Sequence, residues 1–258
     1  RATQALGAKL SAGDATGFME MIKGTVLPQL PKHLADQGET YLRIVVSQLR
    51  KNPKLMECHP ASLVGAIVEA TQVGLRPGVL GECHLVPYSG EVTLIYGYQG
   101  YISLAHRAGV FIRPPVPVYT WEVFDYQPAR IANPIIHEVN IDERPGDEHE
   151  AFAGLRAVYA IATTAGDPYP RVDPVNKKQI LTTGAAKMKA ARTNPWKTHP
   201  LQMALKTAVI RICKYSVKSP EMARALEVDG HSIRAHGGEL EVFVDSETID
   251  ESTGEVGE

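Results

Sequence analysis

Ten positively charged residues stand together near the end of the chain, where they could bind phosphate groups. Between Pro174 and Pro220 the sequence has ten Lys or Arg residues and no Asp or Glu. The whole chain has 27 basic and 29 acidic residues and a net charge of −2, so the residues outside this stretch sum to −12. A concentrated basic stretch in an otherwise acidic protein favours a polyanion as its partner, and phosphate backbones are the commonest polyanion. Charge alone fits an ordinary solvated basic surface equally well.

The second half of the basic stretch predicts a helix with one apolar and one basic side. At 100° per residue, positions 201 to 217 place Leu205, Val209 and Ile212 on one side. Lys206 is predicted to project beside the opposite side. No acidic residue stands four positions from a cation of that side, although solvated helix faces usually mix signs. Four residues of the opposite side form what we call the basic ridge: Thr207, Arg211, Lys214 and Lys218.

Further residues of the same stretch are candidates for DNA contact. Trp196, next to Lys197 at the predicted start of the helix, would either stack on a base or anchor the helix by packing, and packing is the commoner function. We expect phosphate contacts first from Lys206, Arg211 and Lys214. A second group of candidates comprises Arg107, Lys187, Lys189 and Arg192.

Metal and nucleotide chemistry have weaker support in the sequence. Cys58-His59 and Cys83-His84 combine zinc-ligand types, but their ligands are adjacent rather than separated by two to four residues. A metal-dependent nuclease site has no paired-carboxylate spacing to support it. The chain lacks the G-x-x-x-x-G-K-[ST] motif, which argues against a P-loop ATPase. The residues that a nuclease site would draw on are Glu82, His84, Asp125 and His137.

The remaining composition indicates a globular protein of the cytoplasm. The chain has 258 residues, of which 44% are apolar, and this is enough for a substantial core. Its three cysteines are sparse and odd in number, which favours a reducing compartment over a disulfide framework. No run of about 18 apolar residues predicts a membrane span, and we expect no membrane partner.

The pattern of apolar residues predicts an α+β fold in which helices flank an antiparallel sheet and hairpin core. Helical spacing is seen at 18–27, 39–51 and 60–74, and again in the short segment 101–107 and in 176–190. The dipeptide Ser89-Gly90 between two apolar runs predicts a hairpin of strands 82–88 and 91–96. Further strands are predicted at 111–113, 119–124, 135–139, 152–162 and 169–172, with an acidic loop at 138–150.

Three regions are predicted along the chain. Residues 1–35 form a flexible or helical N-terminal segment, and residues 36–228 form the core. Residues 229–258 form an acidic tail without fixed structure, because from Gly237 onward the chain has eight acidic and no basic residues.

Ordered motifs over about Leu30 to Pro220 resemble the RecT family of phage and prophage single-strand DNA annealing proteins. The first motifs are Asn52-Pro53-Lys54-Leu55 and the run Gly81-Glu82-Cys83-His84-Leu85-Val86-Pro87. The next is Gly97-Tyr98-Gln99-Gly100-Tyr101-Ile102, followed by Leu104-Ala105-His106-Arg107-Ala108-Gly109. The most recognisable signature lies in the basic stretch: Asn194-Pro195-Trp196-Lys197-Thr198-His199, Met203-Ala204-Leu205-Lys206-Thr207-Ala208 and Arg211-Ile212-Cys213-Lys214-Tyr215.

The resemblance implies an annealing-type fold and an ATP-independent, non-enzymatic recombination protein. Such a protein coats single-stranded DNA as a ring or filament of subunits and anneals it to a complementary strand. It would act in the bacterial cytoplasm beside a partner exonuclease and the host single-strand binding protein, with no required cofactor and with magnesium as a possible aid to annealing. A metal-dependent nuclease and a passive single-strand binder are the alternatives.

One residue departs from the family pattern. The turn Gly97-Tyr98-Gln99-Gly100 has Gln99 where the family often has Lys. A neutral amide still donates a hydrogen bond to a phosphate or a base, but the contact would depend less on salt than a lysine contact.

Overall fold

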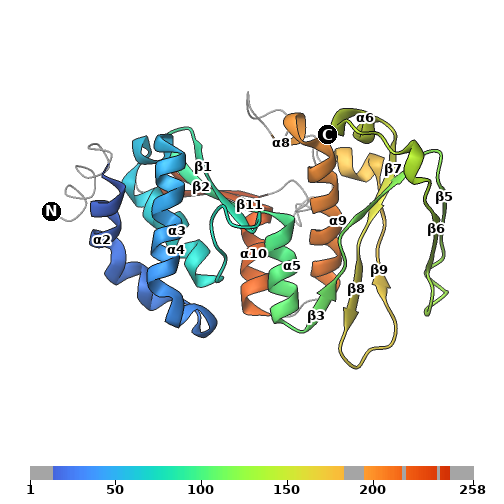
Figure 1. Cartoon of the computed structure of the whole chain (residues 1–258), viewed down its shortest axis with the longest axis horizontal. Helices are drawn as coiled ribbons and strands as arrows, with labels where there is room; N and C mark the ends of the chain where they lie inside the picture. The colour runs from blue at the N-terminus through green and yellow to red at the C-terminus, as the bar shows by residue number, and fades with distance from the viewer. Residues whose placement is uncertain (1–13, 183–194, 217–218, 237–238, 245–258) are drawn as a thin grey trace, which may run out of the picture. The chain divides into compact units, whose positions relative to one another are not determined.

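The computed structural model describes residues 14–182, 195–216, 219–236 and 239–244. It shows helices combined with antiparallel sheets, so the predicted α+β class is confirmed (Figure 1). The chain divides into two compact units. Unit 1 contains the residues up to Gly100 and those from Pro220 onward, and unit 2 contains Tyr101–Ser219.

Unit 1 begins with the predicted early helices, which are confirmed as α2 (Ala15–Val26), α3 (Gly38–Lys51) and α4 (Pro60–Gln72). Asp14 accepts a hydrogen bond from the amide of Gly17 and so caps α2. Phe18, Val45 and Leu63 are fully buried where α2 packs against α3 and α4. Short 3₁₀ helices join these elements: η1 (Leu27–Gln29), η2 (Lys32–Gln37) and η3 (Pro53–Glu57).

The predicted hairpin of unit 1 is also confirmed. β1 (Cys83–Tyr88) pairs with β2 (Glu91–Tyr96) in antiparallel register. Ser89 and Gly90 both have positive φ, at 50° and 83°, as a two-residue hairpin turn that matches strand twist requires. Helices α4 and α10 (Pro220–Gly230) both contact β2, so the hairpin is packed by one helix from the N-terminal part of unit 1 and one from its C-terminal part.

A close approach between two backbone segments, which we call the glycine crossing, lies at the start of α5 (Tyr98–Arg107). A Cβ atom on Gly97 would lie 1.9 Å from the carbonyl oxygen of Gly81, and one on Gly100 would lie 2.2 Å from that of Glu82. The Glu82 carboxylate accepts a hydrogen bond from the amide of Arg76, at 2.9 Å. Gly97 and Gly100 therefore permit a backbone contact that no other residue would allow at these positions.

Unit 2 is built on two small antiparallel sheets and a hairpin. One sheet has the strand order β3-β8-β9 and the other β10-β7-β4, while β5 and β6 form the hairpin. The strands are β3 (Val110–Ile112), β4 (Val116–Tyr119), β5 (Val123–Tyr126), β6 (Ile135–Glu138), β7 (Leu155–Tyr159), β8 (Ile161–Thr164), β9 (Arg171–Val172) and β10 (Val175–Asn176). Besides the larger part of α5, the described helices are η4 (Ile141–Glu143), α6 (Glu148–Ala153), α8 (Pro195–Thr198) and α9 (Pro200–Ser216), and residues 177–182 are helical.

Two predicted strands of unit 2 had the wrong boundaries. The segment 119–124 is the end of β4, a turn and the start of β5. The segment 152–162 starts in α6 and then contains β7 and the start of β8. In the second case Asp147 accepts hydrogen bonds from the amides of His149 and Glu150, so an N-cap starts a helix inside the predicted acidic loop.

In the C-terminal part of unit 1, β11 (His231–His236) pairs with β12 (Glu239–Val244) where we expected no regular structure. The predicted limits of the three regions, 1–35, 36–228 and 229–258, stay predictions. Across the described ranges, no helix is both long enough and apolar enough to span a membrane.

Candidate nucleic-acid interface

Helix α9 carries the central part of the predicted interface and buries one of its sides. Ala204, Ala208, Val209 and Ile212 are at most 1% exposed, and α9 packs against α6, β7, β8 and β9. The predicted apolar side is thus confirmed at Val209 and Ile212, whereas Leu205 is only half-buried.

The basic ridge lies on the more exposed side of α9. Lys214 is exposed, and Thr207 and Arg211 are half-buried. The Thr207 hydroxyl donates to the carbonyl oxygen of Met203 one turn earlier, at 2.9 Å. Lys218 lies outside the described residues. In the described part of the ridge, the Lys214 side chain is therefore exposed and that of Arg211 is partly accessible.

Arg211 has an acidic partner that the helix sequence could not reveal. Its Nε donates a hydrogen bond to Oδ2 of Asp173, in the segment between β9 and β10. The Arg211 side chain is 34% exposed and that of Asp173 is 25% exposed. A phosphate that binds Arg211 must therefore compete with a charge-assisted bond already present within the protein.

Lys206 lies on the buried side of α9, not beside the exposed ridge as predicted. The residue is 8% exposed, and its amine lies 5.9 Å from the centre of the Tyr101 ring, a cation–π distance. Its contact with a phosphate stays a prediction, and packing is the role that the structure supports for it.

Trp196 is buried, with 5% of its surface exposed, and α8 packs against α9. Of the two functions weighed from the sequence, this placement favours the packing anchor over stacking on a base. Lys197 is exposed on the same short helix.

The start of α9 is contacted by a carboxylate that the sequence did not indicate. Glu148 accepts a hydrogen bond from the Gln202 amide, at 3.3 Å, and its carboxylate lies 3.1 Å from Nδ1 of His199. A carboxylate is favourable at a helix N-terminus, where amides point outward.

The other predicted contact residues are spread over both units. Gln99 is exposed in the first turn of α5 in unit 1, and Arg107 is exposed at the end of α5 in unit 2. Lys187, Lys189 and Arg192 lie outside the described residues. Unit 2 therefore contains Lys197 at the N-terminal end of α9 and Arg211 and Lys214 toward its C-terminal end, while the roles of all ten residues in DNA binding stay predictions.

The residues proposed for the alternative nuclease site are divided between the two units, and His137 is bonded to side chains outside that set. Asp125 and His137 are in unit 2, whereas Glu82 and His84 are in unit 1. Both ring nitrogens of His137 are engaged, with Glu122 at 3.0 Å and with the Tyr159 hydroxyl at 3.1 Å. In the register of β5 and β6, Phe124 pairs with His137 and Asp125 with Ile136, so Asp125 and His137 point to opposite faces.

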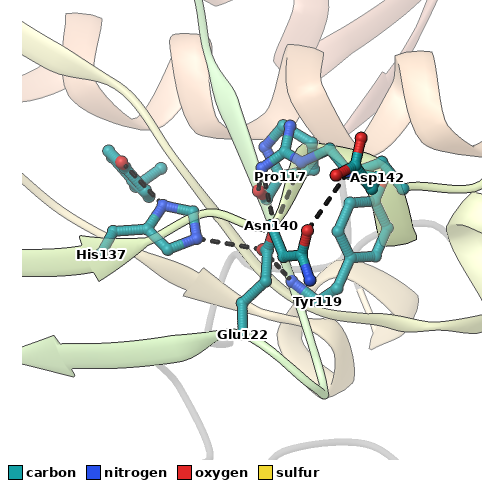
Figure 2. Close-up of polar contacts among 8 residues, drawn as sticks. Pro117, Tyr119, Glu122, His137, Asn140 and Asp142 are labelled. Atoms are coloured by element: carbon teal, nitrogen blue, oxygen red, sulfur yellow. Dashed lines mark hydrogen bonds and ion pairs between the residues drawn. The ribbon is translucent and has the colours of Figure 1, made fainter.

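Glu122 is the centre of a buried polar cluster in unit 2 (Figure 2). Its carboxylate accepts from the Tyr119 amide at 2.8 Å and from Arg144 at 3.1 Å, besides the contact with His137. Burial raises the pKa of this carboxyl, but these three hydrogen bonds together outweigh it and hold the pKa below the usual value of 4.5. The cluster fastens the β5–β6 hairpin and the segment around Arg144 to the end of β4.

The cysteines likewise do not support a zinc site. Cys58 and Cys83 are buried, and burial raises the pKa of both thiols, which disfavours the thiolate that zinc requires. The Cys58 thiol donates to the carbonyl oxygen of Lys54 at 3.4 Å. Among the described residues, no group of three His, Cys, Asp or Glu side chains is placed to hold a metal ion.

The sequence reasoning missed a cluster at the C-terminal end of α9. Arg171 at the start of β9 donates from its guanidinium to the carbonyl oxygen of Tyr215, at 3.1 Å. Tyr215 is 62% exposed. Tyr215 falls within the most recognisable family signature, and its position next to Lys214 was the available signal.

These features describe an α+β protein with a basic helix packed on antiparallel strands, and the comparisons with known proteins identify its class. The RecT family pattern matches residues 39–234, and the chain belongs to this family. It is 32% identical to Protein RecT of Escherichia coli (strain K12) over 86% of this chain and 82% of that protein. It is 24% identical to the uncharacterized protein YqaK of Bacillus subtilis (strain 168) over 78% of this chain and 68% of that protein.

Family membership supports a role in single-strand DNA annealing during recombination. The predicted resemblance is confirmed, and the match covers the signature in α8 and α9. The matched region also includes the glycine crossing and the Glu122 cluster, so it contains structural residues as well as the residues predicted to bind DNA.

Proposed function

We propose that the protein binds single-stranded DNA and anneals it to a complementary strand without ATP and without breaking a bond. The observation that carries this proposal is α9, whose apolar side is buried while Arg211 and Lys214 lie on its accessible side within the matched family region. Phosphates bound along this side would leave the bases free to pair. Base pairing then supplies specificity, and the protein supplies charge neutralisation and spacing.

Several subunits acting together would give the strand a continuous path. In a ring or filament, each α9 would contribute its ridge to one path for the strand. A partner exonuclease would supply the single strand, and a host single-strand binding protein would hold it beforehand. We propose a cytoplasmic site of action in the bacterial host, with magnesium at most as an aid to pairing of the two strands.

Salt dependence tests the phosphate contacts. If each subunit neutralises about three phosphates, the log–log slope of single-strand affinity against salt should be about −2 per subunit. The double change Arg211→Ala and Lys214→Ala should reduce the slope by about 1.4 and weaken binding. The chain should stay folded, although loss of the Arg211–Asp173 pair should lower the melting temperature slightly. A slope near zero for the wild type would contradict the proposal.

Lys206→Met is the matched control for that double variant. It removes a positive charge from the same helix, but from the buried side, where an apolar chain of similar volume fits. We expect an unchanged salt slope. A slope reduced as far as by a single ridge substitution would show that Lys206 contacts phosphate after all.

An annealing time course separates the alternatives. Labelled complementary strands with magnesium should give full-length duplex faster with the protein than without it. Shortened strands would indicate a nuclease, and strands that are coated but pair more slowly would indicate a passive binder. Electron micrographs after sequential addition of the two strands would show whether subunits form rings or filaments.

A further inference from the structure

The end of α9 presents an exposed aromatic ring among cationic side chains. Tyr215 is in the last turn of α9 and is 62% exposed, and its neighbour Lys214 is exposed as well. The Arg171 guanidinium donates to the Tyr215 carbonyl oxygen at 3.1 Å, which satisfies one of the carbonyl groups left open at a helix C-terminus. The backbone that carries the ring is therefore held in place, although the ring itself is in solvent.

The strand register shows on which face Arg171 lies. Arg171 pairs with Ala162, and Ala162 pairs with Ile112, so these three side chains share one face of the β3-β8-β9 sheet. Ala162 is 1% exposed and Ile112 is 4% exposed, which marks this face as the one covered by the packed interior. Arg171 stands at its rim, where half of its side chain is exposed and reaches the end of α9.

The charges around Tyr215 are nearly balanced within the described residues. Arg171 lies 3.6 Å from Asp167, Arg211 pairs with Asp173, and Lys214 adds a further positive charge. Two of these three cations are thus already paired with carboxylates within the protein. Besides its cations, this end of α9 combines a planar ring and a planar guanidinium, the two groups on which unpaired bases stack.

We propose that Tyr215, with Arg171 beside it, forms a base-stacking subsite that binds one unpaired nucleobase of a single strand whose phosphates follow the ridge of α9. This rests on the proposed function, because the ligand is the same single strand. It adds a contact to a base where the ridge provides contacts to phosphates. A tyrosine ring stacks on any base, so the subsite would not select sequence.

Two probes test the subsite: oligo(dT) and an oligonucleotide of equal length whose residues are all abasic. Tyr215→Ala should lower the affinity for oligo(dT) about tenfold and leave the affinity for the abasic strand and the salt slope unchanged. Tyr215→Phe should retain wild-type affinity for both, because the ring is kept. Tyr215→Leu, which is apolar but not planar, should behave like the alanine variant.

Phe111→Ala is the matched control. Phe111 is 54% exposed and pairs with Thr163, so it lies on the opposite face of the β3-β8-β9 sheet from Arg171. We expect no change in affinity for either probe. Melting temperatures of all variants check that each chain is folded.

The outcomes separate the two proposals. If Tyr215→Ala binds oligo(dT) as the wild type does, or loses both probes equally, the subsite is wrong while single-strand binding stands. If the wild type binds neither probe, the proposed function itself fails. If Phe111→Ala lowered the affinity for oligo(dT) as much as Tyr215→Ala, the base-stacking contact would not be specific to Tyr215.

Discussion

Arg211 shows why a residue must be judged with its neighbours. On the helix alone it is a cation without an acidic partner four positions away. In the folded chain the Asp173 carboxylate, 38 positions earlier, is hydrogen-bonded to its guanidinium. A DNA phosphate and this carboxylate need the same N–H groups. A strand that binds at Arg211 would therefore have to replace the Asp173 carboxylate or share the guanidinium with it.

Asp173→Asn should therefore strengthen single-strand binding. The amide keeps the size of the side chain but removes the negative charge that competes with phosphate, so we expect a several-fold gain in affinity at low salt and a steeper salt slope. Fluorescence anisotropy with oligo(dT) over a salt series measures both quantities. Unchanged affinity would mean that Arg211 remains bound within the protein during DNA binding.

The Glu122 cluster makes stability depend on acid. The pKa of the Glu122 carboxyl is lowered below 4.5 in the folded state. The ionised carboxylate therefore stabilises the fold above pH 4.5, and this stabilisation is lost as the pH falls through the lowered pKa. We expect Glu122→Gln to lower the free energy of unfolding by about 1.5–3 kcal/mol at neutral pH. The difference from the wild type should shrink between about pH 5 and pH 3, as followed by urea unfolding.

A constant difference between the two proteins across that pH range would contradict this assignment. It would mean that Glu122→Gln acts through packing instead of charge. Asp142→Asn is a suitable control, since Asp142 is exposed near the same cluster and its carboxylate is not among the groups bonded to Glu122.

The positions of single side chains were the least predictable part of the candidate site. Helical periodicity placed Val209 and Ile212 in the core correctly, because both lie near the centre of the apolar side. Lys206 lies at the border of that side, where the angle on a helical wheel does not decide whether a neighbour such as the Tyr101 ring covers the chain. Partners such as Asp173 and Glu148 come from other elements and leave no mark in the helix sequence.

At the scale of the elements, the glycine crossing shows how backbone contact restricts sequence. Both Gly97 and Gly100 face carbonyl oxygens of the segment before β1 at distances that exclude a Cβ atom. The restriction is steric and is independent of any ligand, so the two glycines of this turn have a structural explanation. Gln99 between them is exposed and is the residue of the turn available for contacts outside the protein.

Gly97→Ala should destabilise the protein by about 1–3 kcal/mol, because the added methyl group would lie 1.9 Å from the Gly81 oxygen and the two segments would have to separate. Gly65→Ala is the control. Gly65 is exposed in the middle of α4, and no atom lies within 4 Å of the place that a methyl group would take, so alanine should stabilise by about 0.5–1 kcal/mol. Thermal unfolding should show opposite shifts for the two variants; shifts of equal sign would argue against the crossing.

Elements with a regular apolar spacing or a clear turn signal could be predicted from the sequence. The boundaries of elements within continuous apolar runs could not. Helices α2, α3 and α4 and the hairpin β1–β2 have regular spacing bounded by Pro or by Ser89-Gly90. The run from Tyr119 to Phe124 has apolar residues on both sides of a turn, so its sequence does not show where β4 ends. In the segment 152–162, the cap at Asp147 lies outside the apolar run that suggested a strand.

For the whole molecule, separation of charge along the chain is the main electrostatic feature. The stretch from Pro174 to Pro220 carries +10, while the last 14 residues, 245–258, carry six acidic and no basic residues. An acidic segment on the same chain competes with DNA for cationic side chains, and the competition is strongest at low salt.

Deletion of residues 245–258 should raise single-strand affinity at low salt, since the net charge changes from −2 to +4. The gain should disappear at high salt, where charges are screened. Replacement of the same residues by an uncharged segment of equal length should act like the deletion. If only the deletion raised affinity, the length of the segment, and not its charge, would be responsible.

Because synthesis runs from the N-terminus to the C-terminus, unit 1 begins first and is completed last. Unit 1 is completed only by residues from Pro220 onward, and Met222 and Ala225 of α10 are fully buried. As the protein leaves the ribosome, α2, α3, α4 and the β1–β2 hairpin emerge first, but the helix that contacts β2 emerges after all of unit 2. A nascent chain stopped before Pro220 would thus contain the whole basic stretch together with an incomplete unit 1, and we expect such chains to be substrates for chaperones and proteases.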